Sequence, residues 1–203
     1  MAGLSDMACH RSDFTTGDRP AAAGLTSPAS NIHQARMRRI VVLGCSGAGK
    51  STFAKALGAK FGLPVVHLDT LFWQPGWVEP EPEAFRAAVA AAIAGDAWVT
   101  DGNYVGRTFD LRLPRADAVI FIHQPRWLCL LRVVSRWLRN IGGDRPDLAP
   151  GCPEKIDWPF FQWVWGFERM NQPQILAAAT SYAVPITHLR GDAEMKRYLQ
   201  TAR

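Results

Sequence analysis

The stretch that decides the fold is "RIVVLGCSGAGKST", residues 39–52. Its apolar start, residues 39–43, predicts a buried strand. A helix is expected over residues 50–61, because Gly62-Leu63-Pro64 follows and stops it. Between the two lies the complete spacing G-x-x-x-x-G-K-[ST], formed by Gly44, Gly49, Lys50 and Ser51. A strand before and a helix after the full pattern argue against a chance match in a turn.

Each residue type in this loop has a physical task. Glycines let the backbone approach phosphate oxygens closely and point several N–H groups at them. The helix beginning near Lys50 adds its positive end, the ammonium group reaches the β- and γ-phosphates, and the Ser51 hydroxyl faces Mg²⁺. The predicted ligands are therefore ATP and Mg²⁺. The predicted nucleotide-binding residues are Gly44, Ser46, Gly47, Ala48, Gly49, Lys50, Ser51 and Thr52.

Further along the chain, apolar runs alternate with helical patterns. Strands are expected at residues 65–68, 97–100, 118–122 and 185–189. Helices are expected at residues 80–94, from Pro125 onward, and after Gly191. This alternation predicts a parallel sheet covered by helices on both faces.

Two carboxylates follow predicted strands. Asp101 closes the strand in "AWVTDG" and is the first candidate to hold Mg²⁺ together with Ser51. Asp69 closes "VVHLD" and is the second. Open α/β sheets bind ligands at the carboxyl ends of their strands. The alternative for either residue is a helix cap.

The segment "PRWLCLLRVVSRWLRN", residues 125–140, is a strongly basic helix. Arg132, Arg136 and Arg139 lie on one side at helical spacing. The opposite side is apolar and carries Trp127, Leu128, Leu131, Val134, Trp137 and Leu138. Neighbouring like charges destabilise an isolated helix, so an anionic partner is one reason for them; a solvated face is the other. A Gly/Pro-rich loop with Arg145 follows, and we interpret residues 139–156 as a lid.

Composition supports one globular domain. The 203 residues are 48% hydrophobic and 20% charged, and no apolar run is long enough to span a membrane. Four cysteines share no pair spacing, which favours reduced thiols and a cytoplasmic protein. The net charge of +5 reflects either codon bias toward arginine or an affinity for polyanions.

The first 36 residues have a different composition. They are rich in Ser, Thr, Ala, Gly and Pro and lack periodicity, so we expect a disordered extension at 1–36 before a domain at 37–203. Whether translation starts at Met1 or Met37 stays open.

The order of these motifs resembles the nucleoside-monophosphate-kinase-like branch of P-loop proteins. More narrowly, "HLDTLFWQPGW", "DGNY" and "RPDLAPGCPEKIDW" resemble the group called DNA topology modulation protein, which is FlaR-related and adenylate-kinase-like. The resemblance implies a three-layer α/β/α P-loop NTPase fold with a five-stranded parallel sheet, a lid and an acceptor-binding insertion. It also implies that Asp101-Gly102 holds Mg²⁺ through water and that Arg132 and Arg136 meet adenine and phosphates.

One departure concerns the acceptor. Adenylate kinases continue Asp-Gly with Phe-Pro-Arg, whereas this chain has Asn103-Tyr104. The acceptor-side arginine is missing from its usual place, which puts AMP as acceptor in doubt. Arg107 and Arg112 either substitute for it or are surface residues.

The aromatic residues form two groups. Trp73 and Trp77 either line the acceptor site or pack in the core, while packing is the expectation for the second group. The second group consists of Trp158, Phe160, Phe161, Trp163, Trp165 and Phe167. Aromatics beside a basic surface also suit nucleic-acid bases, but no nucleic-acid-binding motif supports that partner.

The prediction is therefore an ATP-dependent kinase that acts on a small-molecule or nucleotide acceptor. Asp69 would orient or deprotonate the acceptor, by analogy with small-molecule kinases. The predicted catalytic residues are Lys50, Asp69, Asp101, Arg132 and Arg136. The alternative is a nucleotide-dependent regulator without a small-molecule acceptor.

Overall fold

The computed structural model describes residues 37–140, 151–152 and 157–202. The predicted extension, residues 1–36, lies outside the described residues, as do residues 141–150 and 153–156 of the predicted lid. Both therefore stay predictions.

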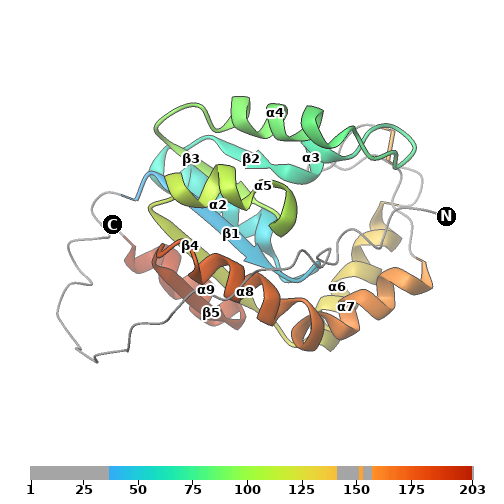
Figure 1. The fold of residues 1–203 in the computed structure, drawn as a ribbon. Helices are drawn as coiled ribbons and strands as arrows, with labels where there is room; N and C mark the ends of the chain where they lie inside the picture. Colours follow the sequence, from blue (N-terminus) through green and yellow to red (C-terminus); the bar gives the residue numbers. More distant parts are fainter. Residues whose placement is uncertain (1–36, 141–150, 153–156, 203) are drawn as a thin grey trace, which may run out of the picture.

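A five-stranded parallel sheet forms the centre of the protein (Figure 1). Its strands are β1 Arg39–Gly44, β2 Val65–His67, β3 Trp98–Asp101, β4 Ala118–His123 and β5 Ile186–Arg190. They are arranged in the order β2-β3-β1-β4-β5. Ile40 of β1 pairs with Val99 on one side and with Ala118 on the other. The central position of β1 places the loop that follows it in the middle of the carboxyl edge.

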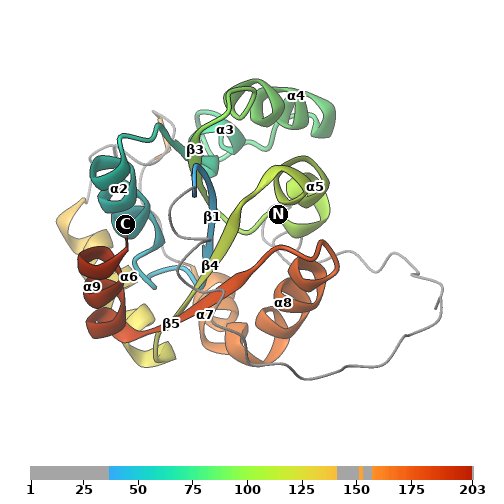
Figure 2. The ribbon, with the colours of Figure 1, turned by 90° about the vertical axis from the view of Figure 1, so that its left-hand side faces the viewer.

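Helices cover both faces of the sheet. The helices that precede β4 are α2 Lys50–Phe61, α3 Leu68–Phe72, α4 Pro82–Ala92 and α5 Val105–Arg112, followed by a 3₁₀ turn at Leu113–Arg115. Those after β4 are α6 Arg126–Arg139, α7 Trp158–Met170, α8 Gln172–Thr180 and α9 Gly191–Thr201. In Figure 2, α2 and α9 lie on one side of the sheet, and α5 and α8 lie on the other. The three-layer prediction is confirmed.

The core lies between these layers. Residues 40–43 of β1 and 119–121 of β4 have no exposed surface, as befits central strands that are covered on both faces. Large side chains from the helices complete the packing, among them Phe53 of α2 and Phe85 of α4, each 1% exposed.

One predicted boundary is wrong in a way that matters for the site. We expected a second strand over residues 65–68 with Asp69 directly after it. Instead β2 ends at His67, and Leu68 begins α3, so Asp69 is the second residue of a helix. Leu68 is fully buried, and the Asp69 carbonyl accepts the Trp73 N–H at 3.2 Å, which closes this helix.

Candidate functional site at the carboxyl edge of the sheet

The backbone of the phosphate-loop motif is left-handed at two positions, a conformation that favours glycine. Gly47 and Gly49 have φ values of 78° and 92°. A Cβ atom on Gly47 would lie 2.3 Å from the Cys129 carbonyl oxygen, and one on Gly44 would lie 2.6 Å from the Ile122 carbonyl oxygen. A side chain at Gly44 or Gly47 would therefore clash with neighbouring backbone, which explains these two glycines.

Lys50 and Ser51 begin α2, directly after this loop. The Lys50 ammonium group donates to the Cys45 carbonyl at 2.8 Å, so the side chain folds back over the loop. Gly49 caps the helix without a side-chain hydrogen bond, and the first turn has no acidic residue. The positive end of α2 therefore has no internal carboxylate in its first turn to neutralise it.

The buried carboxylate of Asp101 ends β3 beside β1. Asp101 is 4% exposed and pairs in register with Val42 of β1 and His67 of β2. Its Oδ1 lies 2.7 Å from Nδ1 of His67. His67 was not predicted as a site residue, because its contact with Asp101 depends on β2 lying beside β3.

Asp69 has a partner that the sequence did not predict. The Tyr104 hydroxyl donates to Asp69 Oδ1 at 2.7 Å. The Tyr104 ring lies 4.9 Å from the Phe72 ring and 5.1 Å from the Phe85 ring. Burial, and then the nearby Asp69 carboxylate, raise the pKa of Tyr104 well above its ordinary value, so this hydroxyl keeps its proton as a donor.

Asn103 joins this region to the phosphate loop. Its side-chain oxygen accepts the Gly44 N–H, and its side-chain nitrogen donates to the Gly44 carbonyl, both at 3.1 Å. The segment Asn103-Tyr104, noted above as part of "DGNY" and as a departure from adenylate kinases, therefore bonds both to the loop and to Asp69.

Arg112 is not a surface residue, so that alternative is wrong. It is fully buried and donates to the carbonyls of Gly102 and Asn103 at 3.0 and 2.6 Å, and to the Thr108 hydroxyl at 3.0 Å. Burial lowers the pKa of Arg112 to about 9. Arg112 is thus an internal support for the segment that carries Asn103 and Tyr104.

Arg107 is also held by the protein. Its guanidinium group donates to Glu79 Oε2 at 3.1 Å and lies 5.0 Å from the centre of the Phe72 ring. Its side chain is 20% exposed, so it is not a freely solvated surface residue.

Of the three α6 arginines, Arg132 lies beside the phosphate loop. Nη1 of Arg132 is 3.8 Å from the position of a Cβ on Gly49, and its Nη2 pairs with Asp192 of α9 at 2.5 Å. Arg136 is partly buried. Arg139 is exposed and bonds to Ser135 of its own helix. Arg132 and Arg136 are therefore partly covered by the protein, on the helix that also buries Cys129 and Val133, while Arg139 is not covered.

Much of the apolar side of α6 faces outward. Trp127, Leu131 and Leu138 are 56–58% exposed. The physical reason is that α6 approaches Gly47 closely, and the backbone of Cys129 forms this contact. A helix packed on a charged site turns its arginines inward, and periodicity alone does not distinguish that from ordinary core packing.

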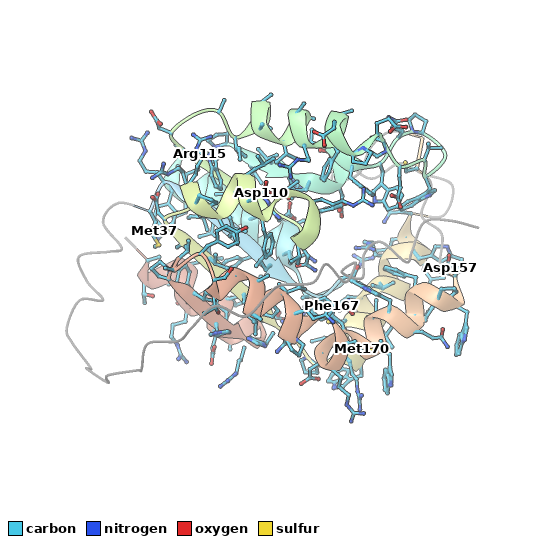
Figure 3. All side chains as sticks on the ribbon, in the orientation of Figure 1. Met37, Asp110, Arg115, Asp157, Phe167 and Met170 are labelled. Carbon is cyan, nitrogen blue, oxygen red and sulfur yellow. The ribbon has the colours of Figure 1, made fainter. Side chains whose placement is uncertain are left out.

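The aromatic groups divide between core and surface. Trp73 is 7% exposed and its ring lies 5.1 Å from that of Trp77, so Trp73 is packed. The second group lies on α7, beside α6 (Figure 1). There Phe167 is buried while Trp158 is 71% exposed, so core packing is only partly correct for it. Figure 3 labels Phe167 and Met170, and Met170 at the end of α7 is 68% exposed.

Two searches of the described residues gave negative results. No group of three or more His, Cys, Asp or Glu side chains forms a metal cage in the described ranges. A phosphate-loop Mg²⁺ site does not need one, since its protein ligands are the loop hydroxyl and a strand-end carboxylate. Likewise, no helix in the part of the chain with described coordinates is long and apolar enough to cross a membrane.

A loop of this sequence after the central strand of a parallel sheet, with helices on both faces, defines a P-loop α/β protein. Comparison with solved structures agrees on the fold. Shikimate kinase from Acinetobacter baumannii, solved in complex with shikimate, superposes with a TM-score of 0.52 at 17% identity, covering 85% of this chain and 96% of that one. Shikimate kinase from Bacteroides thetaiotaomicron gives a TM-score of 0.47 at 20% identity, covering 81% and 96%.

At these identities the likeness concerns the fold. No protein-family model matches the chain, and no curated protein matches it. The resemblance to the DNA topology modulation group therefore stays a prediction.

Proposed function

We propose that the protein is an ATP-dependent kinase that transfers the γ-phosphate of ATP to a hydroxyl group of a small molecule. The observation that carries this proposal is the meeting of three elements at one sheet edge. The phosphate loop follows β1, Asp101 ends β3, and Asp69 follows β2 and bonds to Tyr104. Ligands of open α/β sheets bind at this edge.

On the nucleotide side, the backbone N–H groups of the loop would bind the phosphates. Lys50 would exchange its bond to the Cys45 carbonyl for one to a phosphate oxygen. Arg132, which lies beside Gly49, would add a second cation. Ser51 and Asp101 would hold Mg²⁺, which neutralises phosphate charge when bound. The buried Asp101 fits this role because His67 orients its carboxylate from the next strand.

On the acceptor side, Asp69 would accept a hydrogen bond from the reacting hydroxyl. Tyr104 occupies Oδ1 of this carboxylate, which fixes its orientation. The acceptor oxygen forms a bond to the γ-phosphorus, the bond from the β–γ bridging oxygen breaks, ADP leaves, and Asp69 takes the hydroxyl proton. Positioning and charge neutralisation supply most of the acceleration in such transfers, so Lys50, Arg132 and Arg136 are the residues that would stabilise the transferring group.

Two further observations support this reading. The Acinetobacter baumannii neighbour is a kinase whose structure holds shikimate, a small hydroxylated acceptor, on the same fold. Cys45, Cys129 and Cys152 are free thiols, which supports a reducing, cytoplasmic compartment.

The test is ATP consumption measured against a panel of nucleosides, nucleoside monophosphates and hydroxylated metabolites. We expect one class of compound to stimulate turnover strongly, and Lys50→Ala to abolish that turnover. Lys55→Ala is the matched control, since Lys55 is exposed on the same helix. Stimulation that survives in Lys50→Ala would contradict the proposal. Absence of any stimulation, together with salt-sensitive binding of duplex DNA, would favour the regulator instead.

A further inference from the structure

We propose that the acceptor is a neutral or amine-bearing hydroxyl compound without a carboxylate or phosphate group. This inference rests on the proposed kinase function and names its substrate class. It differs from what the resemblances suggest, since AMP carries a phosphate and shikimate carries a carboxylate. The relevant arginines are those of residues 63–116, which we call the acceptor side; this segment runs from just before β2 to just after the 3₁₀ turn.

Three of the four arginines on the acceptor side are occupied by structural partners. Arg86 makes a two-pronged ion pair with Asp110 at 2.6 and 3.0 Å. Arg115 donates to the carbonyls of Ile93, Ala94 and Gly95, and Arg112 donates to those of Gly102 and Asn103. Recruiting Arg112 for a substrate anion would leave buried carbonyls unpaired, and recruiting Arg86 or Arg115 would break the contacts that hold them.

The fourth, Arg107, lies over the Phe72 ring, which packs against Tyr104. Its charge opposes the rise in the pKa of Tyr104, but burial and Asp69 outweigh it and the pKa stays raised. Glu79 pairs with Arg107 at 3.1 Å, and both side chains are only partly exposed, at 20% and 26%. An anionic acceptor would have to displace Glu79 while approaching Asp69 as well. Two carboxylates against one guanidinium group disfavour a further negative charge there.

The wider charge distribution acts in the same direction. The acceptor side contains seven Asp and Glu residues, four arginines and no lysine, while the whole chain has a net charge of +5. The positive charge is thus concentrated away from this side, on the elements that carry the phosphate loop and α6. This charge distribution favours the triphosphate on the side of the phosphate loop and disfavours a further anion on the acceptor side.

The first experiment compares acceptors in pairs that differ by one anionic group. Adenosine is tested against AMP, and the methyl ester of shikimate against shikimate, beside neutral polyols and amino alcohols, with Mg-ATP binding measured in parallel. We expect every compound that stimulates ATP turnover to be neutral or cationic. A carboxylate or phosphate compound with a kcat/KM more than tenfold above its uncharged partner would overturn the inference while leaving the kinase proposal intact.

The second experiment changes the residue that blocks Arg107. In Glu79→Gln the guanidinium group loses its carboxylate partner, and we expect the KM for the anionic member of a pair to fall at least tenfold, with the KM for ATP unchanged. Glu83→Gln, an exposed position on the same side, is the matched control and should leave both values unchanged. Unaltered discrimination in Glu79→Gln would overturn the inference. If ATP binds but no compound stimulates turnover, the kinase proposal fails and this inference falls with it.

Discussion

Tyr104 has a left-handed backbone, with φ 41° and ψ 47°, which is costly for an aromatic residue. Such a conformation costs about 1–2 kcal/mol and persists only where the surroundings impose it. Arg112 binds the two preceding carbonyls, and Asn103 pairs with Gly44. The strain lies where the phosphate loop and Asp69 are joined, so we infer that it serves to hold these two groups in fixed relation.

The Tyr104 hydroxyl is therefore expected to matter more for turnover than for nucleotide binding. Tyr104→Phe keeps the ring packing against Phe72 and Phe85 but removes the hydrogen bond to Asp69. A hydrogen bond to a charged group contributes about 1.5–3 kcal/mol, so acceptor-stimulated kcat should fall about tenfold or more. Steady-state kinetics with calorimetric Mg-ATP binding measure both effects. A lost ATP affinity with unchanged kcat would contradict the role.

At the scale of single residues, those that belong to a recognisable motif were predicted from the sequence. Lys50, Ser51 and Asp101 follow from loop spacing and strand ends, and the structure places them at one edge. His67, Asn103 and Tyr104 escaped prediction because their importance depends on which strands become neighbours. Only the order β2-β3-β1 brings His67 beside Asp101 and Asn103 beside Gly44.

Among the elements, α6 exposes much of its apolar side and buries residues outside it. Val133 is 1% exposed and Leu131 is 58% exposed, although both are apolar residues of the same basic helix. Val133→Ala should lower the free energy of unfolding by about 1–2 kcal/mol, the effect of losing two buried methyl groups. Leu131→Ala should change it by less than about 0.5 kcal/mol. Urea denaturation measures both variants, and the reverse order of effects would refute this orientation of the helix.

The same orientation makes Arg132 the arginine of α6 that matters most for ATP. Arg132→Ala should raise the KM for ATP about tenfold, because removing one charged contact to phosphate costs about 1.5–3 kcal/mol. Arg139→Ala is the control, since Arg139 is exposed and bonds to its own helix. Equal effects of the two substitutions on ATP kinetics would show that the helix contributes only a general positive field.

The strands and the helices α2, α4, α6 and α9 were predictable from apolar runs, periodicity and Gly/Pro punctuation. Helices α3, α5, α7 and α8 were not predicted. Leu68–Phe72 is only five residues long, and its apolar residues read equally well as the end of a strand. Helix α7 begins at an Asp157 cap that accepts the Phe160 N–H at 2.9 Å, a signal hidden by the aromatic composition of the segment.

For the whole molecule, hydrogen bonds between the start of β1 and the residue before β4 make the free energy of unfolding depend on pH. Asp117 precedes β4 and accepts the N–H groups of Arg38 and Arg39 and the Arg39 guanidinium group. Burial alone raises the pKa of Asp117, but these hydrogen bonds outweigh it and lower the pKa below its ordinary value.

The pKa of Asp117 is lower in the folded protein than in the unfolded chain, where it is about 4, so the ionised carboxylate stabilises the fold above that pH. This stabilisation is lost as the pH falls from about 4 toward the lower pKa of the folded state. The melting temperature should therefore decline below about pH 4. Asp117→Asn should lose about 1 kcal/mol at pH 7, the scale of a partly exposed ion pair, and show a weaker acid decline. An acid profile identical to that of the parent protein would show that this carboxylate is not involved.

The central claim for the whole molecule is that the loop after β1 binds the phosphates of a nucleotide. Calorimetric titration of the purified protein with Mg-ATP tests it most directly, with Lys50→Ala as comparison and circular dichroism to verify that both proteins are folded. We expect saturable binding below millimolar ATP by the parent protein and at least tenfold weaker binding by the variant. No association at millimolar Mg-ATP by the folded parent protein, or equal affinity in the two proteins, would contradict it.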